Sequence, residues 1–227
     1  MDAIYEEMSH RNTKEFLNKG VQLRDWSDGS HCLAIIAKGA WHMNWKAWGD
    51  LSCFEELLGS EGIVAPMLHH TILVARPWLA QEQGCYTWEH MGWGQEILDL
   101  MNDIESSGME SYAIDFHKLI FTRYGLLMIG KPNKDVNRWR DAIRCKQKAR
   151  GISSGEVYYN NIFHATLFRW IRDLTPREIF EVARAVDTLN KTYTSFAKID
   201  VYGYQIVNAT WLLKEESVEV LVSKDFA

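Results

Sequence analysis

The chain lacks the features that mark several common classes of protein. No stretch approaches the roughly 20 apolar residues that cross a bilayer, and residues 1–28 are polar, without the apolar segment of a secretory leader. The four cysteines are widely spaced and form no Cys-x-x-Cys pair, which argues against a zinc or thioredoxin-like centre. We therefore expect a cytoplasmic protein with reduced thiols and no membrane partner.

A basic excess is also absent, since the net charge is −5 and the isoelectric point is about 5.9. Proteins that coat long nucleic acids depend on many phosphate contacts from Lys and Arg. The charge therefore argues against a long nucleic acid as partner. A small phosphorylated ligand needs only a local group of donors and remains compatible with the composition.

Three frequent catalytic motifs are missing as well. The sequence contains no Ser-centred nucleophile elbow, no Gly-rich phosphate loop and no His-Glu-x-x-His. Catalytic zinc sites usually have three protein ligands, often including a carboxylate. We expect no metal and no cofactor.

Hydrophobic periodicity and turn residues predict a mixed α+β chain. The clearest local signal is Thr175-Pro176-Arg177-Glu178, which combines a capping box with a proline at the first helical position. The expected helices are part of 41–58, and 95–104, 135–150 and 176–189. The expected strands are 32–37, 65–75, 112–122, 126–129, 162–170, 196–204, 205–213 and 218–222.

These elements follow a nearly repeated order. Each half of the chain reads as strand, helix, histidine-bearing strand and helix, followed by further strands. Such an order predicts an N-terminal arm over residues 1–30 and a single bilobal domain over 31–227. We expect two mainly antiparallel sheets with outer helices and a central cleft.

The pattern His-x-Thr-apolar occurs twice, beginning at His69 and at His164. Both copies lie in expected strands, and each follows an apolar pair. Because side chains alternate along a strand, each histidine shares a face with the threonine two positions on, Thr71 or Thr166. If the lobes oppose these faces, two imidazoles and two hydroxyls meet in one small volume.

That arrangement is suited to phosphoester chemistry. A neutral imidazole accepts a proton from water or a ribose hydroxyl, and an imidazolium on the opposite side donates one to the departing oxygen. Threonine hydroxyls donate to the non-bridging phosphate oxygens. The mechanism requires both rings to reach solvent on opposite sides of one phosphate, and it leaves open which histidine is the base.

The two motifs and the element order resemble the two-histidine (2H) phosphoesterase superfamily, which includes cyclic phosphodiesterases and 2′-5′ RNA ligase-like enzymes. The resemblance covers residues 32 to about 222 as an element order, although the shared letters are essentially the two motifs. It implies that His69 and His164 are catalytic and that Thr71 and Thr166 bind phosphate. It also implies a metal-independent hydrolase that cleaves a cyclic phosphate or a 2′-5′ phosphodiester in a nucleotide or short RNA-like oligonucleotide.

Residues near the motifs have other expected roles. Tyr159, just upstream of the second motif, is a candidate to stack on a base or sugar, with packing at the rim as the alternative. His70 points away from the cleft if its neighbour faces it, and is expected to be structural. Arg169 lies five residues beyond His164 and so on the opposite face, at the surface. The basic run 138–150 is expected to be mainly a solvated helix face.

Other functions remain open at this point. A non-catalytic nucleotide-binding module with the same fold is the main alternative, although binding alone does not need a paired acid and base. An interaction protein with a tryptophan-rich surface predicts no cleft at the motifs, and a metal-dependent hydrolase predicts loss of activity with a chelator. Neither the particular substrate nor the oligomeric state follows from the sequence.

Overall fold

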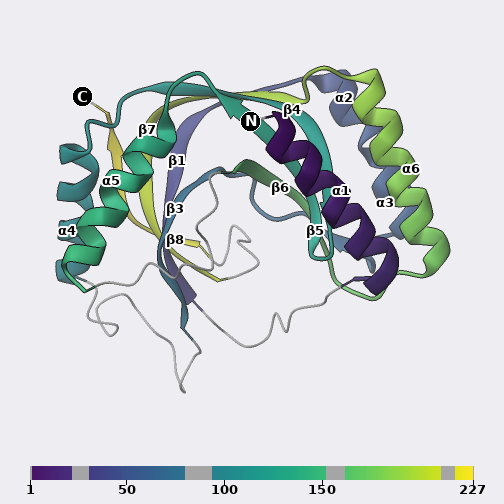
Figure 1. Cartoon of the computed structure of the whole chain (residues 1–227), viewed down its shortest axis with the longest axis horizontal. Coiled ribbons are helices and arrows are strands. Elements are labelled where there is room, and N and C mark those ends of the chain that lie inside the picture. Colours follow the sequence, from purple (N-terminus) through teal and green to yellow (C-terminus); the bar gives the residue numbers. More distant parts are fainter. Residues whose placement is uncertain (1, 22–30, 80–93, 152–161, 211–217, 227) are drawn as a thin grey trace.

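The computed structural model describes residues 2–21, 31–79, 94–151, 162–210 and 218–226 (Figure 1). These residues form an α+β structure, as expected. The helices are α1 (Asp2–Lys19), α2 (Trp45–Asp50), α3 (Ser52–Leu58), α4 (Gly94–Ser106), α5 (Val136–Ala149) and α6 (Pro176–Thr192). The strands are β1 (His31–Met43), β2 (Ile63–Val64), β3 (Thr71–Leu79), β4 (Tyr112–Thr122), β5 (Gly125–Pro132), β6 (Phe163–Trp170), β7 (Ala197–Thr210) and β8 (Val218–Asp225).

The strands form one antiparallel sheet of eight rather than the two sheets expected. Its order is β2-β6-β5-β4-β7-β1-β3, and β8 also pairs with β7. The sheet is continuous because β7 is long enough to pair with three strands. Along one edge of β7, residues 197–201 pair with β4 and residues 203–209 pair with β8, and the other edge of β7 pairs with β1. The break expected between residues 204 and 205 is wrong, because β7 runs through that point without a turn.

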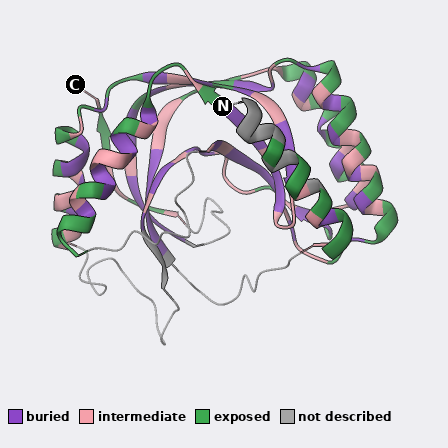
Figure 2. Ribbon diagram, in the orientation of Figure 1, coloured by how far each residue is buried: buried purple, intermediate pink, exposed green. Residues whose placement is uncertain are grey.

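The sheet arches between two groups of helices (Figure 1). Helices α4 and α5 lie on one side of the arch, and α2, α3 and α6 lie on the other. The longer helices pack through residues three and four apart. For example, α6 buries Ile179, Val182, Val186 and Leu189, and its outer face is exposed (Figure 2). The capping box expected at its start is present, with Thr175 and Glu178 bonded reciprocally.

The structure of residues 41–58, expected to be helical in part, begins as a strand and continues as two short helices. Strand β1 continues to Met43, so Trp41 lies in a strand and stacks on Phe116 with ring centres 5.3 Å apart. Two short helices then follow instead of one, because the chain turns at Leu51 before α3 begins. Gly59, with a φ of 66°, ends α3 in a conformation that favours glycine.

The N-terminal helix α1 is attached to the rest of the chain through Phe16. Its ring lies 5.0 Å from that of Phe121 and 5.9 Å from that of Trp170, measured between ring centres. Arg123 adds a hydrogen bond of 3.1 Å from Nε to the carbonyl of Gly20. Over the described ranges, no helix is both long enough and apolar enough to span a membrane.

Candidate active site

The first motif lies in a segment, residues 65–70, that links the two ends of the sheet. Before it, Val64 pairs with Arg169 of β6; after it, Thr71 pairs with Ile36 of β1. The last hydrogen bond to β1 runs from the amide of Ala37 to the carbonyl of His70, at 2.8 Å. The expected strand 65–75 is therefore wrong at its start, because the chain must leave β6 before it can join β1.

His70 joins the two motifs directly. Its Nδ1 lies 3.2 Å from the carbonyl oxygen of His164, and because a carbonyl only accepts, Nδ1 donates. The ring is fully buried and packs against Phe163 at 5.8 Å between ring centres. Burial, followed by the positive charge of Arg140, lowers the pKa of His70 well below 6.5. These contacts fit the structural role expected for this residue.

His69 is held by its own segment. Its Nδ1 lies 2.7 Å from the carbonyl oxygen of Met67 and donates to it, so Nε2 is the proton acceptor of the neutral ring. The side chain is only 7% exposed, and the expectation of an open, solvated ring is wrong for this residue. The reason is its position in the segment between the two ends of the sheet. Burial lowers its pKa and the charge of Arg169 lowers it further, against an opposing effect of the Met67 carbonyl.

His164 is half-buried on β6, and its carbonyl accepts the hydrogen bond from His70, the neighbour of His69. Burial lowers its pKa to about 3, with added contributions from the charges of Arg169, His69 and Arg140. Strand β3 pairs with β1, whereas β6 pairs with β5 and β2, so the histidines do not lie on paired strands. They meet because the 65–70 segment runs from one edge of the sheet to the other.

The two threonines differ in their surroundings. Thr71, half-buried, is the first residue of β3, and its carbonyl accepts a hydrogen bond of 3.2 Å from Nη2 of Arg140. Thr166 is 3% exposed and lines a cavity of about 230 Å³ together with Leu68 and Phe168. Tyr159, the predicted stacking residue, lies outside the described residues.

Arg169 is a functional candidate, and the expectation that it lies on the face opposite His164 is wrong. Leu126 pairs with Phe168, but Leu127 pairs with Thr166, so β6 has one extra residue, Leu167, at a β-bulge. Beyond a bulge the alternation of side chains shifts by one position. Arg169 therefore lies on the face of His164 and Thr166, and its charge lowers the pKa of both catalytic candidates.

The basic helix α5 is not simply a solvated face. Arg140 is 2% exposed and Arg144 8%, so both belong to the buried face of the helix. Helical spacing sets these two arginines apart from the exposed Arg138, because they follow Val136 by four and eight residues and lie on the stripe that also buries Trp139 and Ile143. The expectation of a solvated face takes the basic run as one unit and so misses this signal.

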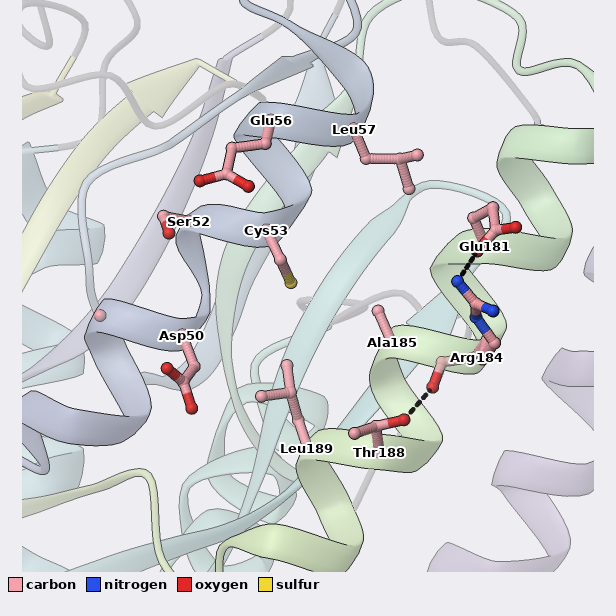
Figure 3. Close-up of a pocket in the computed structure, with 11 residues that line it drawn as sticks. Asp50, Ser52, Cys53, Glu56, Leu57, Glu181, Arg184, Ala185, Thr188 and Leu189 are labelled. Carbon is pink, nitrogen blue, oxygen red and sulfur yellow. Dashed lines mark hydrogen bonds and ion pairs between the residues drawn. The ribbon is translucent and has the colours of Figure 1, made fainter.

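A larger cavity, of about 730 Å³, lies between α3 and α6 and includes none of the motif residues (Figure 3). Cys53 and Glu56 face it from α3, and on α6 Arg184 pairs with Glu181 at 2.6 Å. Among the residues that the structure describes, no group of three or more His, Cys, Asp or Glu is arranged to hold a metal ion.

No family model matches the chain, and no curated protein does. Solved structures are similar in fold. The conserved protein of unknown function ATU0111 from Agrobacterium tumefaciens str. C58 is 11% identical, with a TM-score of 0.53 over 92% of this chain and 97% of that one. TT0787 of Thermus thermophilus is 13% identical, with a TM-score of 0.48 over 86% of this chain and 97% of that one. The likeness to ATU0111 concerns the fold alone.

Proposed function

We propose that the chain is a phosphodiesterase of the two-histidine type, with His69 and His164 as its acid–base pair. Because His69 is only 7% exposed, the proposal requires the substrate to reach its Nε2 through the small part of this residue that remains accessible. The observation that supports this most strongly is the meeting of the two His-x-Thr motifs, joined by the hydrogen bond from His70 to the carbonyl of His164. A purely structural pair of histidines does not need a matched threonine on each side. The arch of the sheet between two helix groups is in keeping with a bilobal 2H fold.

In the proposed reaction, a neutral imidazole takes a proton from the attacking water or hydroxyl as the new P–O bond forms. The other imidazole gives a proton to the departing oxygen as the old P–O bond breaks. Both rings have a lowered pKa, so the free protein lacks that second proton at neutral pH. The negative charge of the bound phosphate raises the pKa of the nearby rings, and substrate binding is therefore coupled to proton uptake.

The remaining groups of the proposed site bind the anion. Arg169 offers a planar guanidinium that suits the two non-bridging phosphate oxygens at once, and the hydroxyls of Thr71 and Thr166 donate to the remaining lone pairs of the same oxygens. This small set of donors is matched to one phosphodiester rather than to a long backbone. The proposed substrate is a cyclic nucleotide or a short 2′-5′-linked oligonucleotide.

A panel assay tests this function. Purified protein in EDTA is incubated with 2′,3′-cyclic nucleotides, 2′-5′ oligoadenylates and cyclic oligonucleotides, alongside His69→Ala and His164→Ala. We expect turnover of at least one class, with a loss of about 10²–10⁴-fold in each variant. His42→Ala is the matched control, because His42 is an exposed histidine of β1 paired with Asp200.

Two outcomes would contradict the proposal. Full activity in both histidine variants would remove the acid–base pair. Binding of a nucleotide without turnover of any substrate would favour the alternative, a non-catalytic binding module with the same fold.

A further inference from the structure

One buried cation contacts the main chain at both motifs. Nη2 of Arg140 donates to the carbonyl of Thr71 at 3.2 Å, and Nη1 donates to the carbonyl of Ile162 at 3.4 Å. Thr71 follows His69 by two residues, and Ile162 precedes His164 by two residues. The guanidinium of Arg140 alone therefore bridges segments that are 91 residues apart in the chain.

The orientation of this guanidinium is fixed by further contacts. Its central carbon lies 4.3 Å from the ring centre of Phe163, the residue between Ile162 and His164. Nη1 also donates to Oδ1 of Asn137, one turn earlier on the same helix, at 3.3 Å. Because the guanidinium is held against the ring of Phe163 and by Asn137, it has little conformational freedom. It therefore fixes the positions of the two carbonyls to which it donates.

We propose that Arg140 is a positioning residue that sets the distance between His69 and His164. This inference rests on the proposed phosphodiesterase function and assigns to that site a residue outside the two motifs. Without the guanidinium, the carbonyls of Thr71 and Ile162 lose this donor, and the start of β3 is no longer tied to the residue that leads into β6. Because an acid–base pair acts across one phosphate, a shift of about 1 Å in the spacing costs about 10²-fold in rate.

Arg140 also acts through its charge, which can be separated from its hydrogen-bonding geometry. Its positive charge contributes to the lowered pKa of His164, after the effects of burial, Arg169 and His69. Removing the positive charge raises the pKa of His164. A lysine at position 140 retains the positive charge and therefore keeps this pKa low. Lysine cannot reproduce the planar fork that spans two carbonyls.

The test compares Arg140→Met, Arg140→Lys and the matched control Arg144→Met. Arg144 is a second buried arginine of α5, one turn away, and bonds to Asp141 of its own helix at 3.0 Å. Imidazole NMR signals of His69 and His164 are recorded against pH in each variant, and kcat and KM are measured on the best substrate of the panel. Thermal unfolding verifies that each variant is folded.

We expect Arg140→Met to move the ring signals of both histidines, to raise the pKa of His164 and to lower kcat by about 10²-fold with KM little changed. Arg140→Lys should retain the pKa of His164 and recover only part of kcat, whereas Arg144→Met should leave the ring signals in place. If Arg140→Met does not fold, Arg140→Lys decides. Displaced ring signals in this variant support the positioning role, and unchanged ring signals contradict it.

Ring signals in Arg140→Met that match those in Arg144→Met would overturn the positioning role. The NMR readout needs no turnover. Displaced ring signals in a protein that cleaves none of the substrates would therefore leave the positioning role standing while the phosphodiesterase function fails.

Discussion

Arg169 is the residue whose charge reaches both catalytic candidates. After the larger effect of burial, it lowers the pKa of His69 and of His164. The same positive charge attracts the phosphate whose arrival raises those pKa values again. Arg169 thus favours the neutral form of both rings in the free protein, and in the proposed complex it is the charge of the bound phosphate that favours protonation.

This gives a pH dependence with a defined direction. In the proposed mechanism the reactive form of the free protein has one neutral and one protonated ring. Both pKa values lie below the usual 6.5, so the optimum of kcat/KM should lie below pH 6.5. Arg169→Met removes a positive charge, raises both pKa values and should move the optimum to higher pH, whereas Arg169→Lys should keep it near that of the wild type. An optimum above pH 6.5 in the wild type, or none of this displacement in Arg169→Met, would contradict the electrostatic account.

At this scale the sequence predicts the motif histidines and misses the arginines around them. His69 and His164 are visible because the pattern is repeated with matched neighbours. Arg169 was assigned to the opposite face because no letter in the sequence marks the bulge at Leu167. The spacing of Arg140 from Val136 places it on the buried stripe of α5, but the two distant carbonyls that it contacts cannot be predicted from the sequence.

The position of β6 depends on how closely its main chain approaches Gly125 of the neighbouring strand β5. Gly125 of β5 pairs with Arg169, and a Cβ added to it would lie 2.1 Å from the carbonyl oxygen of Phe168. A main-chain atom cannot yield at that distance without moving the strand next to the bulge. The close approach of β6 therefore requires glycine at position 125. The placement of Arg169, which pairs with Gly125, depends on this glycine.

Gly125→Ala should destabilise the protein by about 1–3 kcal/mol and displace Arg169, so the pH optimum should move in the direction of Arg169→Met. Urea unfolding and the pH dependence of kcat/KM measure the two effects. Gly49→Ala is the control, because a Cβ at this position of α2 meets nothing within 4 Å. Unchanged stability in Gly125→Ala would show that the strand yields freely.

Elements with local signals were predicted well, and elements defined by pairing were not. Helix α6 begins at its capping box, and the β4–β5 hairpin turns near residues 123–125, as expected. The start of β3 and the continuity of β7 depend on which distant strand lies alongside, and β7 exchanges β4 for β8 along one edge. No residue pattern within those segments records that exchange.

Considered as a whole, the molecule brings the ends of one sheet together. Its outermost strands, β2 beside β6 and β3 beside β1, are joined by residues 65–70, which contain His69 and His70. The sequence predicted the α+β class but not a single continuous sheet, because its near-repeat suggests two separate units. The path of one six-residue segment explains why motifs distant in sequence meet.

A double-mutant cycle on His69→Ala, His164→Ala and the double variant tests the central claim most directly. If the two histidines act as one catalytic unit, the first substitution already removes the contribution of the pair. The double variant should then have a kcat/KM no lower than that of the slower single variant. Independent residues multiply their losses. A double variant slowed by the product of the two single losses would show that His69 and His164 do not act on the same phosphate.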